Sequence, residues 1–302
     1  MKNPTVAIVG GASLLGRELQ DLIRDSKLKW TVRLLSGEAD GSAGTITASG
    51  EDATYLEPIS SEALAEADVT FLAGTRESSA EALRLDPAGQ FVDLTGVVKD
   101  DTMQPLLHPA AKGLALLLEK LKYAEYVIAT VFEPASERGH AGVAELQKQS
   151  SSLLSFQPLP KDVFDAQAAF NLLAEYGEDA PVSLAAVEDR IYNDLLTLRP
   201  DANLSLRLIQ TPVFHAYGVL AFVRFPSAVD SIESLFQKDP RIDLRTGGTE
   251  APSTAGAAQQ DGFQVGSFRK DRRDPRAWWV WMTFDNLRVA ASDALEVAKE
   301  LL

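Results

Sequence analysis

A glycine-rich turn near the start of the chain has a residue spacing suited to binding a phosphate. Gly10, Ser13 and Gly16 follow the apolar run 6–9 and open a stretch with helical apolar spacing, 14–23. A strand, a glycine turn and a helix in this order point backbone N–H groups and the helix dipole at a pyrophosphate. Ser13 stands where a glycine would let the backbone approach the phosphates. The turn predicts a retained dinucleotide site, and a purely structural turn is the alternative.

Residues further along indicate which dinucleotide is expected. About 20 residues after the turn, where such folds contact the ribose, the sequence reads Leu35-Ser36-Gly37-Glu38. A carboxylate accepts hydrogen bonds from ribose hydroxyls and repels a 2′-phosphate, so Glu38 favours NAD over NADP. An ordinary exposed acid in a loop is an equal alternative for Glu38. The predicted cofactor-binding residues are Gly10, Ala12, Ser13, Leu14, Gly16, Ser36, Glu38, Ala73 and Gly74.

The residues that commonly hold metals or act as nucleophiles are sparse. The three histidines, His108, His140 and His215, lie far apart, and none has a partner at a recognised ligand spacing, so no metal site is predicted. The chain has no cysteine. Its absence excludes disulfides, thiolate ligands and a cysteine nucleophile together.

Charge and hydropathy exclude two classes of partner. The net charge of −14 repels nucleic acid, which binds proteins through excess Lys and Arg. No apolar stretch approaches the roughly 18 residues needed to cross a bilayer, and the first residues lack the pattern of a secretory signal. With 45% hydrophobic residues, the sequence predicts a soluble cytoplasmic protein of about two domains, with a small molecule as the candidate ligand.

The order of apolar runs divides the chain into two kinds of fold. Over the first 120 or so residues, short apolar runs alternate with helical segments, which is typical of a doubly wound, Rossmann-like α/β domain. After residue 121 the pattern is that of a mixed α+β domain. Its predicted strands are 126–132, 204–213, 219–225, 263–268 and 278–284, and its predicted helices are 139–149, 182–197 and 231–237.

The end of the chain has helical apolar spacing over 286–302, and this helix is expected to return to the first domain. The predicted domains are therefore 1–123 with 286–302, for dinucleotide binding, and 124–285, a substrate-binding α+β domain. Segment 246–261 is rich in Gly, Ala, Ser and Thr without apolar periodicity, and it is predicted to be a mobile loop.

Several segments, taken together, resemble the aspartate-semialdehyde dehydrogenases. The resemblance spans nearly the whole chain and implies a nucleotide-binding domain, an α+β domain that carries dimerisation, and a homodimer. It rests on the order and separation of the glycine turn 10–16, Phe71-Leu72-Ala73-Gly74, Phe91-Val92-Asp93-Leu94-Thr95-Gly96, Ala169-Phe170-Asn171-Leu172-Leu173, Thr211-Pro212-Val213-Phe214 and Asp285-Asn286-Leu287-Arg288.

The family's reaction runs through a thioester on a cysteine in an Asn-Cys motif at a helix start, where the helix N-terminus stabilises the thiolate. In this chain the matching helix is 108–114, and the cysteine position falls near Pro109 to Ala111. Neither proline nor alanine can form a thioester. The resemblance therefore implies that the phosphorylating reaction of the family is lost.

The other catalytic positions of the family have changed as well. The resemblance places Glu133 at the family's Gln, Gln210 at the Arg that clamps the substrate carboxylate, and Tyr217 at the His base. His215 stands two residues earlier, and on a strand a shift of two returns to the same face, so it is a candidate substitute base. A packed or solvent-facing histidine is the alternative. The basic residue that binds the 2′-phosphate corresponds to about Glu38.

Three functional hypotheses follow. The leading one is a relative without the thioester reaction that keeps the scaffold and a dinucleotide or metabolite site for a binding or regulatory role. The alternative is an NAD-dependent oxidoreductase without a covalent intermediate, with Tyr217 or His215 as the proton donor. The third is a purely structural partner subunit. The sequence leaves open whether the protein is an enzyme, and the candidate catalytic residues are Glu133, His215 and Tyr217.

Overall fold

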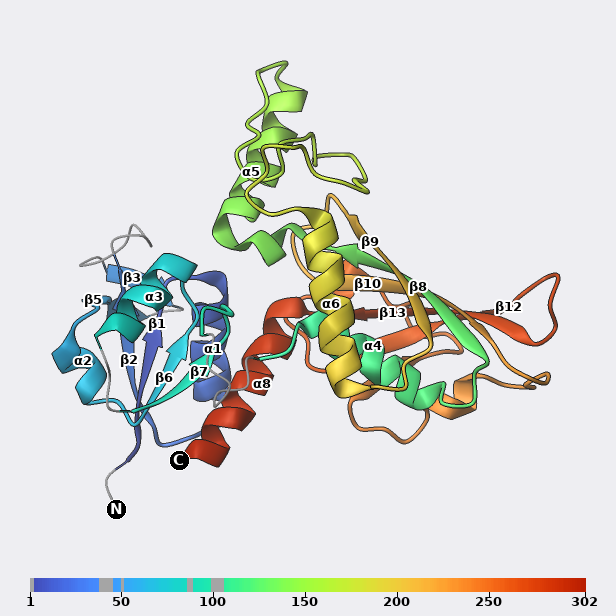
Figure 1. The fold of residues 1–302 in the computed structure, drawn as a ribbon, viewed down its shortest axis with the longest axis horizontal. Helices are drawn as coiled ribbons and strands as arrows, with labels where there is room; N and C mark the ends of the chain where they lie inside the picture. Colours follow the sequence, from blue (N-terminus) through green and yellow to red (C-terminus); the bar gives the residue numbers. More distant parts are fainter. Residues whose placement is uncertain (1–2, 38–45, 50–51, 86–88, 99–105) are drawn as a thin grey trace. The chain divides into compact units, whose positions relative to one another are not determined.

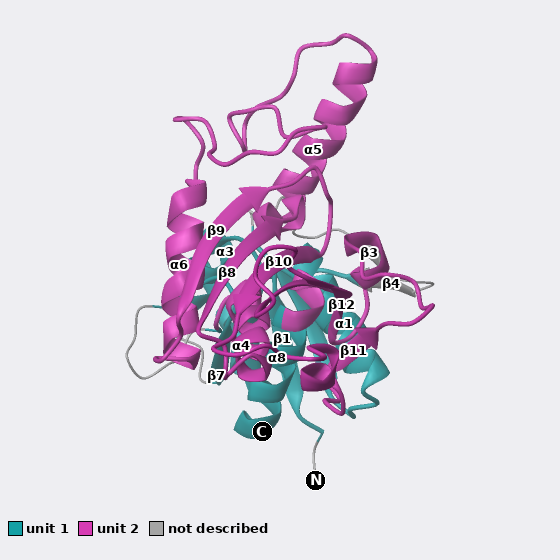
Figure 2. Ribbon diagram, turned by 90° about the vertical axis from the view of Figure 1, so that its right-hand side faces the viewer, with its two compact units in different colours: residues 1–106, 290–302 teal, residues 107–289 magenta. Residues whose placement is uncertain are grey.

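The computed structural model describes residues 3–37, 46–49, 52–85, 89–98 and 106–302. The chain forms two compact units (Figure 2). Unit 1 consists of residues 1–106 and 290–302, and unit 2 of residues 107–289. Among the described residues, no helix combines the length and apolar character needed to span a bilayer.

Unit 1 is built on a five-stranded parallel sheet of order β5-β2-β1-β6-β7 (Figure 1). Every residue of β1 is buried, which explains why the first strand is a continuous apolar run instead of an alternating one. The predicted doubly wound α/β domain is confirmed. Its strands are β1 (Thr5–Val9), β2 (Thr31–Ser36), β5 (Glu57–Pro58), β6 (Val69–Leu72) and β7 (Gln90–Asp93), with a separate hairpin of β3 (Ile46–Ser49) and β4 (Asp52–Tyr55).

Helices cover both faces of this sheet. On one face, α1 (Leu14–Asp25) and α8 (Asn286–Leu301) pack against a core that includes Ile8 and Phe71. On the other face lie α2 (Ser61–Ala65) and α3 (Arg76–Arg84). From Ala290 onward α8 belongs to unit 1, and its buried residues are part of the core on this face.

Unit 2 is built on a six-stranded mixed sheet of order β11-β12-β13-β10-β8-β9. The strand β9 ends at Gln210, three residues earlier than predicted, because Pro212 has no N–H to continue the ladder. The strands are β8 (Tyr126–Glu133), β9 (Leu204–Gln210), β10 (Tyr217–Arg224), β11 (Ile242–Arg245), β12 (Phe263–Lys270) and β13 (Ala277–Phe284).

Only one face of this sheet is covered. Alternate residues such as Val127, Ala129 and Val131 are buried beneath α4 (Pro109–Lys120) and α6 (Leu184–Leu198). The opposite face, here called the open face, carries large side chains that stay partly exposed. They are Tyr126, Ile128, Phe132, Leu220, Phe222, Trp279 and Trp281. The predicted boundary at residue 123 put α4 with the first domain, whereas α4 packs on α6 within unit 2.

The rest of unit 2 contains one long helix, α5 (Gly139–Leu154), and short helical turns. An irregular stretch, here called the 155–183 segment, follows α5 and is held to it by two buried side chains. Glu145 accepts the N–H groups of Val163 and Phe164, and Gln149 accepts those of Ala168 and Ala169. The short elements are η2 (Ala135–Arg138), η3 (Glu233–Phe236), where a longer helix was predicted, and α7 (Thr254–Ala257), inside the segment predicted to be a loop.

Candidate functional site

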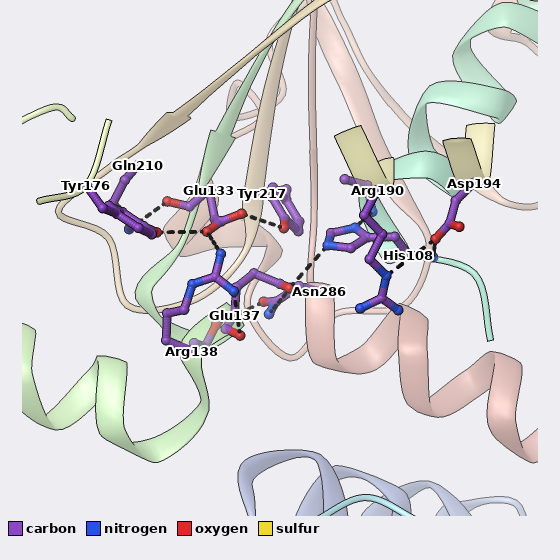
Figure 3. A network of polar contacts seen from close by, with 12 residues as sticks. His108, Glu133, Glu137, Arg138, Tyr176, Arg190, Asp194, Gln210, Tyr217 and Asn286 are labelled. Carbon is purple, nitrogen blue, oxygen red and sulfur yellow. Dashed lines mark hydrogen bonds and ion pairs between the residues drawn. The ribbon is translucent and has the colours of Figure 1, made fainter. Parts of the chain in front are cut away.

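A cluster of polar side chains, buried or half-buried except for the exposed Arg190, lies in unit 2 where β8 and β10 meet the starts of α4 and α8 (Figure 3). The cluster includes residues from eight elements or segments, and each is held by hydrogen bonds or ion pairs to another member. Its members are His108, Glu133, Glu137, Arg138, Tyr176, Arg190, Asp194, Gln210, Tyr217 and Asn286.

His108 closes the first turn of α4. Its Nδ1 accepts the N–H of Ala110 at 3.2 Å, and its own N–H donates to Asp194 Oδ2 at 2.8 Å. Because Nδ1 is an acceptor, the ring proton sits on Nε2, which lies 3.5 Å from Glu137 Oε2. Burial, with a smaller contribution from the Arg190 charge, lowers the pKa of His108 to about 3. The imidazole is therefore neutral near pH 7 and acts as a helix cap.

Glu133 ends β8 and is completely buried. Its Oε1 forms an ion pair with Arg138 and lies 3.1 Å from the Tyr176 hydroxyl. Its Oε2 lies 3.5 Å from the hydroxyl of Tyr217. Burial raises the pKa of Glu133 to about 7 against the opposing charge of Arg138. A carboxyl with this pKa titrates near neutrality.

Glu137 and Asn286 connect η2 to the start of α8. Glu137 Oε1 accepts from Asn286 Nδ2 at 2.9 Å. Asn286 Oδ1 accepts from the Ser136 hydroxyl at 3.1 Å and from the N–H of Ala216 at 3.2 Å, so the orientation of its amide is fixed. Burial also raises the pKa of Glu137, and the Arg138 charge opposes this shift. The Asp-Asn-Leu-Arg segment singled out in the sequence thus serves as a structural joint.

Two tyrosines flank Glu133. Tyr217, on β10, is fully buried, and its ring meets His108 edge-on with the ring centres 6.1 Å apart. Burial, then the charges of Glu137 and Glu133, raise its pKa well above 10, so the phenol keeps its proton. Tyr176 comes from the 155–183 segment, and its hydroxyl donates to Gln210 Oε1 at 2.6 Å.

The structure brings two of the three candidate catalytic residues together. Glu133 and Tyr217 share the cluster, whereas His215 lies half-buried in the turn between β9 and β10 and, within the described residues, bonds to neither. Sequence reasoning missed Glu137, Arg138 and Tyr176 as partners. Tyr176 gave no signal, because it lies 43 residues from Glu133 in a segment without regular structure.

The glycine turn of unit 1 has a shape fixed by its backbone. Gly10 has φ +78°, and a Cβ at this position would lie 2.1 Å from the Cα of Gly74. A Cβ at Gly16 would lie 2.2 Å from the oxygen of Gly10. Both positions therefore need glycine for the close packing of β1, α1 and β6, with or without a ligand.

The side chain of Ser13 makes two hydrogen bonds in this turn that a glycine could not make. Its hydroxyl donates to the oxygen of Ala73 at 2.7 Å and accepts the N–H of Gly16 at 2.8 Å, so it caps α1. The turn thus fits the fold of a dinucleotide site. However, Ser13 accepts the N–H of Gly16, which is one of the donors that a phosphate would use at a helix start.

The other predicted cofactor residues lie around the same turn. The turn follows β1, and Ala73 and Gly74 follow β6, so they meet at the carboxyl ends of two strands where the sheet order reverses, which is where ligands bind in such folds. Ser36 is buried at the end of β2, and Ala12 and Leu14 flank Ser13. Glu38 lies outside the described residues. Within the described ranges, no three His, Cys, Asp or Glu side chains are grouped to hold a metal.

Comparisons with known proteins agree on one family. The profile of the semialdehyde dehydrogenase dimerisation domain matches residues 114–289, more than half of the chain. A USG-1 protein homolog of Pseudomonas aeruginosa is 27% identical over 98% of this chain and 97% of its own length. An aspartate-semialdehyde dehydrogenase of Rickettsia bellii is 22% identical over 100% and 98%, respectively.

Solved structures show the same architecture over the full length. The structure of a probable aspartate-semialdehyde dehydrogenase from Pseudomonas aeruginosa has a TM-score of 0.80 and 27% identity, and it covers 99% of this chain and 98% of its own. Aspartate semialdehyde dehydrogenase II of Vibrio cholerae, solved in complex with ASA, has a TM-score of 0.79 at 19% identity over 100% and 98%. The chain therefore belongs to the aspartate-semialdehyde dehydrogenase family.

Proposed function

We propose that this chain is a family member that does not perform the thioester reaction and acts as a binding or regulatory homodimer. The start of α4, which the resemblance matches to the cysteine helix, carries this proposal. Pro109, Ala110 and Ala111 stand there, and His108 takes the N–H of Ala110 that would otherwise be free to stabilise an anion. The chain offers no thiol anywhere to replace the nucleophile.

The positions that correspond to the family's substrate-binding groups support the same conclusion. The amide of Gln210 donates to the backbone oxygens of Glu133 and Thr211 at 3.1 and 2.8 Å, so it has no proton left for a substrate carboxylate. Tyr217 is buried and directed at Glu133. Both side chains are thus engaged by other groups of the protein, and the alternative of Tyr217 as a proton donor in a hydride-transfer reaction gains no support from this geometry.

The direct test is a turnover assay. The purified chain is incubated with aspartate semialdehyde, inorganic phosphate and either NAD or NADP, and the reduced nicotinamide is followed by absorbance. The Rickettsia bellii relative, assayed in parallel, is the positive control. We expect no phosphate-dependent reduction above the rate without protein. Phosphate-dependent turnover by the purified chain would overturn the proposal.

The proposal includes a dinucleotide at the glycine turn of unit 1. Gly10 and Gly16 provide the backbone shape, and the N-terminus of α1 would face the pyrophosphate. A nicotinamide bound there would supply hydride exchange, and the proposed preference for NAD over NADP rests on Glu38 in the sequence. Calorimetric titration with NAD, NADH, NADP and NADPH tests this part. We expect heat with NAD or NADH only, and no heat with any of the four would refute it.

The homodimer is proposed to form through the open face of unit 2. This face exposes 47% of Ile128 and 37% of Trp279 beside Phe222, and the whole sheet lies in the region matched by the dimerisation profile. Sedimentation of Ile128→Glu tests the interface, with Leu198→Glu on α6, on the covered side of the sheet, as the matched control. We expect a dimer for the wild type and the control and a monomer for Ile128→Glu. A wild-type monomer at all concentrations would exclude the interface.

A further inference from the structure

The hydroxyl of Tyr176 has two acceptors in reach but only one proton. It lies 2.6 Å from Gln210 Oε1 and 3.1 Å from Glu133 Oε1. One of these two bonds must therefore receive its proton from the other partner. Gln210 and Glu133 differ in whether they can supply one.

Gln210 can only accept at this oxygen. Its Nε2 donates to two backbone oxygens, those of Glu133 and Thr211, which fixes the orientation of the amide and leaves Oε1 facing Tyr176. The shorter of the two contacts is thus Tyr176 donating to Gln210. The lone pairs of the Tyr176 oxygen then face Glu133, and the 3.1 Å contact is a hydrogen bond only if Glu133 carries the proton.

The charge balance of the buried cluster points the same way. Among the described residues, Arg138 forms an ion pair with Glu133, and its charge also acts on the carboxyl of Glu137. Arg190 acts on Glu137 too, but it is itself paired with Asp194 at 3.7 Å. With Glu137 ionised and Glu133 neutral, the acid and base charges balance. With both carboxylates ionised, the interior would hold an uncompensated negative charge, which is costly away from water.

We propose that Glu133 is a protonated acid that donates to Tyr176, and that this proton holds the 155–183 segment against β8. Tyr176 packs edge-on against Phe164 within the segment, with the ring centres 5.4 Å apart. Leu173 exchanges two backbone hydrogen bonds with Gln210 at 2.9 and 3.0 Å. The proton on Glu133 therefore adds one hydrogen bond to the contacts that hold the segment on the sheet. The other contacts are backbone hydrogen bonds and apolar packing. This inference does not depend on the loss of the thioester reaction.

The groups that face Glu133 determine when the proton leaves. They are Glu137 and Arg138 from η2 and the start of α5, Tyr176 from the segment, Tyr217 from β10 and, behind Tyr217, His108 from α4 with Arg190 and Asp194 from α6. His108 stays neutral over the relevant range, so the balance lies among Glu133, Glu137 and Arg138. With its pKa near 7, Glu133 loses the proton as the pH rises through neutrality.

The direction in which Tyr176→Phe shifts the titration midpoint of Glu133 tests the proposal. The titration of Glu133 is followed in the intact protein by NMR of its labelled side-chain carboxyl carbon. If Glu133 donates to Tyr176, removing the hydroxyl withdraws an acceptor from the acid and lowers the titration midpoint. If Tyr176 donates to an ionised Glu133, the midpoint rises. A rise or an unchanged midpoint overturns the proposal. The exposed Tyr192→Phe on α6 is the matched control and leaves the midpoint unchanged.

Glu133→Gln keeps the proposal testable should Tyr176→Phe not fold. The wild-type carboxyl binds a proton in the folded state between pH 4.5, its unfolded value, and about 7. Its contribution to stability is complete below pH 4.5 and is lost as the pH rises through 7. Relative to Glu133→Gln, the unfolding equilibrium constant of the wild type should therefore increase about tenfold per pH unit in that window. A ratio that stays constant across the window would contradict the inference.

Hydrogen exchange measures how firmly the 155–183 segment is held on the sheet. The N–H of Leu173, which donates to Gln210, should become less protected above pH 7 in the wild type, after correction for the intrinsic rate. In Glu133→Gln its protection should not change with pH, because the amide does not titrate. Equal pH dependence of Leu173 in both proteins would show that the proton does not hold the segment.

Discussion

The two sheets of this chain differ in how many faces the protein covers. In unit 1, helices bury both faces, and the central strands β1 and β6 are buried along their whole length. In unit 2, helices bury one face, and the strands alternate between buried residues such as Val131 and partly exposed ones such as Phe132. Helices of the same unit cover the first sheet, whereas the second has an apolar face that a partner copy covers in the proposed homodimer.

The sites of the two units differ in a related way. At the glycine turn, the backbone sets the shape, since a Cβ at Gly10 or Gly16 would collide with neighbouring backbone atoms. In unit 2, side chains form the site: Tyr176 bonds to both Glu133 and Gln210, and the hydroxyl of Tyr217 lies 3.5 Å from Glu133 Oε2. Side chains can be exchanged without moving the backbone, so the chemistry of such a site can change while the fold persists.

The largest expected effect is the loss of stability when a buried aromatic ring is removed from the sheet of unit 1, compared with a ring on the open face of unit 2. Phe71→Ala removes a fully buried ring from the sheet of unit 1 and should lower the free energy of unfolding by about 3–5 kcal/mol. Phe222→Ala removes a half-buried ring from the open face of unit 2 and should cost the monomer about 1–2 kcal/mol. Urea unfolding at low protein concentration measures both.

Protein concentration sharpens this comparison. The cost of Phe222→Ala should grow as the concentration rises, because the dimer loses an interface residue, whereas the cost of Phe71→Ala should not. Equal costs for the two variants in dilute protein would mean that the open face is covered within the monomer.

The next effect concerns the cap of α4. His108→Ala removes the acceptor for the N–H of Ala110 and the Nε2–H facing Glu137, and it should cost about 1–2 kcal/mol at pH 7.5. His108→Asn keeps a capping oxygen and should recover most of that loss. Thermal or urea unfolding of the three proteins measures the difference.

The pH dependence of the same variants has a defined sign. The pKa of His108 falls from 6.5 unfolded to about 3 folded, so the stability it provides is complete above pH 6.5 and is lost as the pH falls toward 3. Neither variant carries this titration. The wild type should therefore lose its advantage over His108→Ala on acidification, and an advantage that holds at pH 4 would show that the imidazole is not buried in neutral form.

Most of the fold could be predicted from periodicity. Strands such as β8 and β10 agree with the predicted ranges within a residue or two, because alternation on a half-covered sheet is a strong signal. Shorter elements were not predictable. The helix predicted at 231–237 is a single 3₁₀ turn, and α7 is a four-residue helix in a segment without apolar periodicity.

The site could be predicted only in part. Glu133 and Tyr217 followed from the family's motifs, since each lies at a fixed place relative to a strand end. Their partners could not be found this way, because Tyr176 and Asn286 reach Glu133 and Glu137 through tertiary contacts 43 and 149 residues apart in sequence. Buried polar contacts of this kind have no period, and sequence spacing alone does not locate them.

The smallest expected change in stability comes from a substitution in the glycine turn of unit 1. Ser13→Gly removes the cap of α1, which should cost only a few tenths of a kcal/mol, because glycine is itself tolerated at this position. The substitution also frees the N–H of Gly16 and lets a phosphate approach the backbone. Calorimetry with NAD should therefore show tighter binding to Ser13→Gly than to the wild type.

Ser13→Ala separates the two effects of that substitution. It removes the same hydroxyl, should cost about 1 kcal/mol, and leaves a Cβ between the backbone and the phosphates. Its affinity for NAD should stay below that of Ser13→Gly. If the two variants bind equally well, the hydroxyl alone limits binding, and if neither binds more tightly than the wild type, the turn is only the structural junction that β1, α1 and β6 require.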